Sequence, residues 1–97
     1  MDEALRAQIA RREATEDAVK RTLIEALRLP YAPEAMDVDV ALFGTGLALD
    51  SVDAMELVVA VETRFDVRVP QGEFRTSLRT LGTLVDLVLE LRPEASP

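Results

Sequence analysis

The chain of 97 residues contains no cysteine, no histidine and no tryptophan. The missing cysteine excludes disulfides and thiolate nucleophiles, and because histidine is missing as well, most zinc sites are excluded. Histidine is also the commonest general base at neutral pH, so a hydrolase built on a Ser-His pair is impossible. Tyr31 is the only tyrosine, which argues against aromatic stacking platforms for nucleic acid. These absences favour a protein that is not an enzyme.

Long hydrophobic runs are missing too. No segment approaches the roughly eighteen apolar residues that a membrane span needs, and the N-terminus lacks the apolar core of a signal peptide. Hydrophobic residues still make up 48% of the chain, which is enough for a packed core. The length suits one small domain. We therefore expect a soluble, cytoplasmic, monomeric protein.

Negative charge is unevenly distributed along the chain. Residues 1–30 contain six acids and six bases, whereas residues 31–97 contain twelve acids and five bases, so the net charge of −7 comes from the second part. Such a chain repels nucleic acid and attracts basic protein partners. Solubility alone would explain this excess in an arbitrary domain. Here five acids cluster around one predicted helix, which favours a docking surface: Asp50, Asp53, Glu56, Glu62 and Asp66.

The first predicted helix spans about 16–28, with Thr15 as its N-cap and Pro30 as its stop. Residues 1–14 form an extension in which only Leu5 and Ile9 are large and apolar. Two alternatives stay open for this extension: a backward continuation of the first helix, and a loosely attached tail. Its composition favours a helix with frayed ends.

Three more helices are predicted, at about 51–65, 71–78 and 81–91. A long loop over 31–50 precedes the first of them, with apolar residues that pin it to the core: Val38, Val40, Leu42, Phe43 and Leu47. Thr80 caps the last helix, Pro93 stops it, and residues 93–97 should be disordered. The fold class is therefore all-α, a small four-helix bundle of three main helices and one short one.

The predicted helix over 51–65 carries two apolar stripes. The first follows a core spacing and comprises Ala54, Leu57, Val58, Val61 and Phe65. The second lies beside the acids Asp53, Glu56 and Glu62 and comprises Val52, Met55 and Val59. The pattern alone leaves two interpretations of the second stripe open, a broad core face and a docking surface.

The segment from Leu42 to Leu57, with Asp50-Ser51-Val52-Asp53 at its centre, resembles the prosthetic-group site of acyl carrier proteins. The resemblance covers about residues 18–91 and implies a carrier domain over 15–92. It implies that Ser51 carries 4'-phosphopantetheine and that Asp50 assists its magnesium-dependent loading. The implied shelter for the cargo is lined by residues that are also plain core candidates: Leu47, Val58, Val61, Val69 and Leu78.

The resemblance also implies partners. A phosphopantetheinyl transferase would load Ser51, and acyl-activating or acyl-transferring enzymes would use basic patches to dock on the second helix. The implied docking residues are Val52, Asp53, Met55, Glu56, Val59 and Glu62. No metal site of the chain's own is expected, because the EF-hand pattern fails at Ala41 and Leu42.

Departures from the family pattern bear on the cargo. Ala48, Leu49 and Val52 replace more usual residues around the serine, and Arg64 lies where fatty-acid carriers tend to be acidic. These differences, with the extension, favour a specialised freestanding carrier, and the acids of the second helix favour acyl or polyketide groups as its cargo. Two alternatives remain. One is an aminoacyl or peptidyl carrier, against which the acidic second helix argues. The other is a carrier-like interaction module that is never modified.

Overall fold

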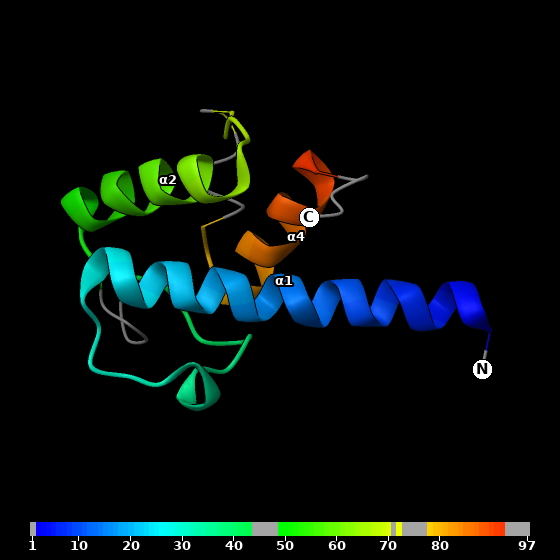
Figure 1. The fold of residues 1–97 in the computed structure, drawn as a ribbon. Helices are drawn as coiled ribbons and strands as arrows, with labels where there is room; N and C mark the ends of the chain where they lie inside the picture. The colour runs from blue at the N-terminus through cyan, green and yellow to red at the C-terminus, as the bar shows by residue number, and fades with distance from the viewer. Residues whose placement is uncertain (1, 44–48, 71, 73–77, 93–97) are drawn as a thin grey trace.

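The computed structural model describes residues 2–43, 49–70, 72 and 78–92. Its elements are α1 (Glu3–Leu27), the 3-10 turn η1 (Pro33–Ala35), α2 (Ser51–Phe65) and α4 (Leu81–Leu91). Figure 1 shows α2 lying over the C-terminal half of α1, with α4 beside α1 and the N-terminal turns of α1 projecting beyond both. The described residues contain no strand, so the predicted all-α bundle is confirmed. Most of the predicted helix over 71–78 and the predicted disordered tail lie outside the described residues.

The predicted start of the first helix is wrong. α1 begins at Glu3, where the Asp2 carboxylate accepts a hydrogen bond from the amide of Ala4 over 3.3 Å. The Thr15 hydroxyl donates back to the carbonyl of Arg11 over 2.9 Å, so Thr15 lies inside the helix and does not cap it. No glycine or proline interrupts residues 3–27, which explains why the helix continues through Thr15.

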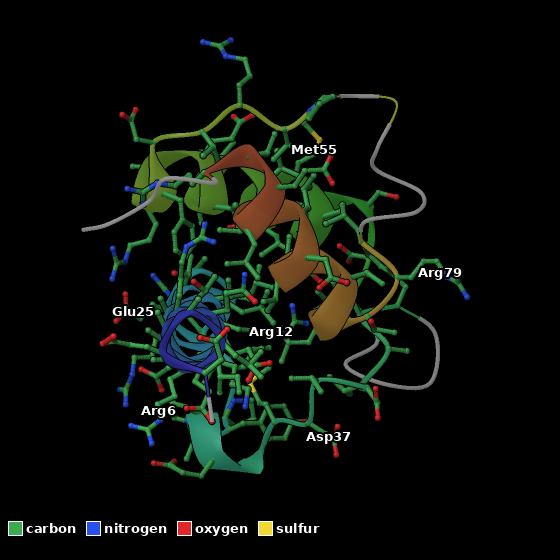
Figure 2. The ribbon with its side chains drawn as sticks, turned by 90° about the vertical axis from the view of Figure 1, so that its right-hand side faces the viewer. Arg6, Arg12, Glu25, Asp37, Met55 and Arg79 are labelled. Atoms are coloured by element: carbon green, nitrogen blue, oxygen red, sulfur yellow. The ribbon has the colours of Figure 1, made fainter. Side chains whose placement is uncertain are left out.

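Two arginines of α1 tie its early turns to α4. The Arg12 guanidinium lies 2.8 Å from the Asp86 carboxylate, between the two helices in Figure 2. The Arg11 guanidinium donates to the carbonyls of Leu89 and Arg92 at the end of α4. Because the last carbonyls of a helix lack partners within it, this contact satisfies the carbonyl of Leu89 in the last turn of α4 and that of its C-cap, Arg92. Of the two alternatives for the extension, a continued helix and a loosely attached tail, the structure has the continued helix. The division of the chain into an extension over 1–14 and a carrier domain over 15–92 stays a prediction.

The core lies between the three helices and is sealed by the loops. The predicted core face of α2 is confirmed at Leu57, Val58, Val61 and Phe65, while Ala54 is only half-buried. α1 contributes Val19 and Leu23. The remaining buried apolar residues come from α4 and the connecting segments: Met36, Leu42, Leu49, Val69, Leu78, Leu81, Leu84, Val85, Leu87 and Val88.

The long loop between α1 and α2 is held by backbone hydrogen bonds to the start of α4. The amide of Gly82 donates to the carbonyl of Val38 over 2.7 Å, and the amide of Leu42 donates to the carbonyl of Arg79 over 3.0 Å. The amide of Leu49 then donates to the carbonyl of Leu42 over 2.9 Å. This ladder satisfies the buried loop backbone and places the residues that start α2.

The loop prediction holds in part. Leu42 is buried, whereas Val38, Val40 and Phe43 are half-buried and Leu47 lies outside the described residues. The buried Met36 was not predicted. Thr80 caps α4 as predicted, because its hydroxyl accepts from the amide of Thr83 over 3.1 Å. Among the described helices, none is long and apolar enough to cross a membrane.

Candidate functional site

Ser51 is the first residue of α2 and is exposed. Asp50, immediately before it, is the N-cap. The Asp50 carboxylate accepts from the amide of Asp53 over 2.9 Å, and the Asp53 carboxylate accepts from the amide of Asp50 over 3.1 Å. This reciprocal capping box fixes the first turn of the helix and therefore fixes where the Ser51 hydroxyl projects.

A hollow of about 800 Å³ opens beside Ser51. Its walls come from the end of the long loop, the first turns of α2 and the segment before α4. The described residues of the lining are mostly apolar, and Asp50 and Arg79 are the charged ones among them: Phe43, Leu49, Asp50, Ser51, Ala54, Met55, Leu78 and Arg79. Of the predicted shelter residues, Leu78 lines this hollow. Val58, Val61 and Val69 are buried in the core, and Leu47 lies outside the described residues. Phe43, Leu49 and Ala54 were missed as shelter residues, because only the fold brings the two loop residues against the first turn of α2.

The second apolar stripe of α2 faces solvent. Val52, Met55 and Val59 expose 64%, 69% and 62% of their surface, although apolar residues of this size are usually buried. The interpretation as a broad core face is therefore wrong. Three exposed apolar side chains on one face of a helix form a surface suited to a protein partner.

The three acids predicted beside that stripe differ in their surroundings. Glu56 is exposed and forms no ion pair or hydrogen bond with the described residues. Asp53 is half-buried and belongs to the capping box. Glu62 is half-buried, and its carboxylate accepts from the amide of Val69 over 2.8 Å. Two of the three carboxylates therefore stabilise the fold locally, a role that helical spacing alone does not reveal.

The start of α2 also fits a phosphate. No described residue accepts a hydrogen bond from the amides of Ser51 and Val52. Free amides at a helix N-terminus and the positive end of the helix dipole both favour an anion bonded at this point. The exposed hydroxyl, these amides and the adjoining apolar hollow together suit a phosphate-linked arm. Within the described part of the chain, no cluster of three or more acidic side chains could hold a metal ion.

Comparison with known proteins agrees with this geometry. Residues 17–88 match the family model described as a phosphopantetheine attachment site. The chain is 44% identical over 71 residues to a D-alanyl carrier protein of Streptococcus sanguinis (strain SK36), covering 72% of this chain and 86% of the relative. It is 41% identical over 76 residues to the D-alanyl carrier proteins of Streptococcus thermophilus (strain ATCC BAA-491 / LMD-9) and Streptococcus gordonii, covering 76% of this chain and 95% of each relative. The predicted carrier family, its non-enzymatic character and its prosthetic group are thus confirmed: the chain belongs to the phosphopantetheine-attachment-site family of carrier proteins, whose prosthetic group is 4'-phosphopantetheine.

Proposed function

We propose that Ser51 is the attachment residue and that the chain carries a small aminoacyl group as a thioester. The observation that carries the first part is the exposed Ser51 hydroxyl at the start of α2, beside an apolar hollow. When bound, the prosthetic group supplies the thiol that this cysteine-free chain lacks. The chain itself positions the arm, shelters its start in the hollow and presents a surface that partner enzymes recognise.

In the loading step, the Ser51 hydroxyl gives up its proton, and its oxygen bonds to the phosphorus that joins pantetheine to the rest of coenzyme A. The bond from that phosphorus to the adenosine-bearing phosphate breaks, and the nucleotide leaves with the proton. A phosphopantetheinyl transferase catalyses this exchange with magnesium. The capping box keeps the hydroxyl at the helix start, and the amides of Ser51 and Val52, which have no acceptor in the described part of the chain, stabilise the new phosphodiester.

Two observations favour an aminoacyl cargo. The relatives that match over most of their length are D-alanyl carrier proteins. The contrary argument rested on an acidic second helix, yet Asp53 and Glu62 form hydrogen bonds within the fold and leave Glu56 as the free acid of that group among the described residues. A carrier of acyl or polyketide groups is the second candidate, favoured by the mostly apolar lining of the hollow.

The exposed stripe of α2 is the surface that we assign to partner enzymes. Val52, Met55 and Val59 would bury apolar area against the transferase or an activating enzyme, and Glu56 would meet a basic side chain at the rim. Asp53 and Glu62 would add to the negative electrostatic potential of this surface without forming ion pairs with the partner enzyme. Action in the cytoplasm, where coenzyme A and activating enzymes are available, remains part of the proposal.

Intact mass spectrometry tests the attachment. The protein is incubated with coenzyme A, magnesium and a broad-specificity phosphopantetheinyl transferase, with Ser51→Ala as the control. One phosphopantetheine adduct on the parent chain and none on Ser51→Ala is the expected result. An adduct on neither chain with several transferases would favour the unmodified interaction module.

The cargo is tested next on the loaded chain. It is offered amino acids with ATP and an aminoacyl-activating enzyme, and in parallel fatty acids and malonyl-coenzyme A with their own transferring enzymes. Transfer of an aminoacyl group faster than the other classes is expected. The reverse order would establish the second candidate.

A further inference from the structure

Arg79 is the only basic side chain among the described residues that line the hollow beside Ser51. It belongs to the short segment before α4, so the fold brings it to the same hollow as Ser51 from a different part of the chain. Figure 2 shows its side chain projecting outward from that segment. The side chain is exposed and forms no ion pair or hydrogen bond with the described residues.

The backbone of Arg79, by contrast, is fixed. Its carbonyl accepts from the amide of Leu42 over 3.0 Å, and the next residue, Thr80, pairs with Ala41. The carbonyl of Leu42 accepts in turn from the amide of Leu49, which immediately precedes Asp50. The same ladder therefore places both walls of the hollow. The backbone of Arg79 therefore holds the loop in place, and its guanidinium has no partner among the described residues.

Attachment of the arm changes the charge balance at this end of the bundle. A phosphodiester on Ser51 adds one negative charge beside the carboxylates of Asp50 and Asp53 and near the exposed Glu56. Like charges at this spacing repel each other, and the amides at the helix start offset only part of that repulsion. A cation at the hollow would relieve the rest. Arginine suits this role because its planar fork of donors matches the oxygens of a phosphate.

We infer that the Arg79 guanidinium is the counter-ion of the Ser51-linked phosphodiester and that it holds the start of the arm over the hollow. This inference deepens the proposed function and rests on attachment at Ser51. With the phosphate held between the start of α2 and Arg79, the arm leaves Ser51 across the apolar surface of Phe43, Leu49 and Leu78. The binding site for the phosphate then includes a residue 28 positions away in sequence.

A thermodynamic cycle tests the inference without any enzyme assay. The unloaded and loaded forms of three chains are compared: the parent, Arg79→Gln and Arg79→Lys. Arg68→Gln serves as the matched control, because Arg68 is also an exposed arginine but does not line the hollow. Intact mass first verifies the adduct on each loaded chain. Thermal unfolding is then followed at low salt under reducing conditions, and the shift caused by loading is compared between variants.

The expected result is a coupling between Arg79 and the arm. Loading should lower the unfolding midpoint of Arg79→Gln by about 4 °C more than it does for the parent, the size expected when one partly exposed ionic contact is lost in a domain of this length. Arg79→Lys should recover most of that shift, and Arg68→Gln should behave as the parent. The excess shift should shrink in 0.5 M salt, because screening weakens exposed charge pairs.

Three results would each overturn the inference, and the experiment distinguishes them. If no chain acquires the adduct, the proposed function is wrong and this inference falls with it. If the adduct forms and Arg79→Gln responds to loading as the parent does, attachment stands and the role of Arg79 is refuted. If the excess shift in the unfolding midpoint of Arg79→Gln persists unchanged in high salt, the guanidinium contacts the neutral carbonyl oxygens of the arm. That result would overturn the assignment to phosphate.

Discussion

Asp50 and Asp53 hold each other across the first turn of α2, since each carboxylate accepts a hydrogen bond from the other's amide, over 2.9 and 3.1 Å. Ser51 lies between them. The same two acids that could be taken for features of a docking surface are thus the local reason that α2 begins at the serine. Any test of surface charge must therefore spare this pair.

Removing the cap should weaken the fold. Asp50→Ala leaves the amide of Asp53 without its acceptor and should lower the free energy of unfolding by about 1 kcal/mol, as loss of an N-cap does. Asp50→Asn keeps an acceptor oxygen and should cost only a few tenths of that. Urea unfolding of both variants measures the difference. Equal losses would mean that the cap acts through charge alone.

Charge reversal at Glu56 should slow the association of partner enzymes with the carrier and leave the fold intact. Glu56→Lys changes an exposed side chain without a hydrogen-bond partner among the described residues, so the unfolding midpoint should move little. The loading rate at low salt should fall several-fold, because electrostatic attraction between docking surfaces mainly speeds association. Glu13→Lys, an exposed reversal on α1 away from Ser51, is the control. Equal loading rates for the two variants would remove Glu56 from the docking surface.

Substitutions at Met55 and Leu57 distinguish the two apolar stripes of α2, because Leu57 belongs to the buried stripe and Met55 to the exposed one. Leu57 is fully buried, so Leu57→Ala should lower the free energy of unfolding by about 2–5 kcal/mol. Met55→Ala should change it by less than about 0.5 kcal/mol, because that side chain is largely exposed. Met55→Ala should instead raise the KM of the transferase for the carrier. Unfolding curves and loading kinetics on the same samples check both, and a strongly destabilised Met55→Ala would contradict the exposed stripe.

Glu62 ties α2 to the segment that follows it. Its carboxylate accepts from the amide of Val69, whose side chain is buried. Glu62→Ala leaves that amide unpaired and should cost about 1–3 kcal/mol, the range for a donor that loses its partner. Glu62→Gln retains an acceptor oxygen and should lose less than half as much. Denaturant unfolding again provides the measurement; a neutral Glu62→Ala would show that water replaces the carboxylate at no cost.

The sequence was sufficient for the elements with strong local signals. The buried face of α2 follows from its periodicity, and the cap of α4 follows from Thr80. Thr15 misled because a threonine followed by acids is a cap signal only where the chain before it is not already helical. Its hydroxyl bonds back to Arg11 inside a helix that starts twelve residues earlier. The local sequence pattern does not reveal that the turn before Thr15 is held by contacts of Arg11 and Arg12 with α4.

The site was predictable at Ser51 and much less so around it. The hollow joins Phe43 and Leu49 of the loop to Leu78 and Arg79, and only backbone pairing across the fold brings these together. Likewise, helical spacing places Glu62 beside the docking stripe, but the turn after α2 directs its carboxylate to Val69. Contacts made through loops leave no period in the sequence, which is why these residues were missed or assigned another role.

The boundary of the N-terminal extension can be located by truncation. Leu5 and Ile9 remain 45% and 42% exposed, so a chain that begins at Ala10 after an initiating methionine should lose less than about 0.5 kcal/mol of unfolding free energy. A chain that begins at Thr15 loses the donors that Arg11 supplies to the end of α4 and the ion pair of Arg12 with Asp86. It should lose a further 1–2 kcal/mol or so, most of it from the carbonyls left without Arg11, because exposed ion pairs contribute little.

Point variants of the full chain separate this effect from helix shortening. Arg11→Ala should reproduce most of the second loss, whereas Arg6→Ala, an exposed arginine one turn before Ala10, should not change stability measurably. If both truncations are equally stable, the predicted division at residue 14 stands and the contacts to α4 are incidental. If only the shorter chain is destabilised, the carrier fold of this protein includes the turn at Arg11 and Arg12, because that turn supplies the donors to the carbonyls of Leu89 and Arg92 at the end of α4.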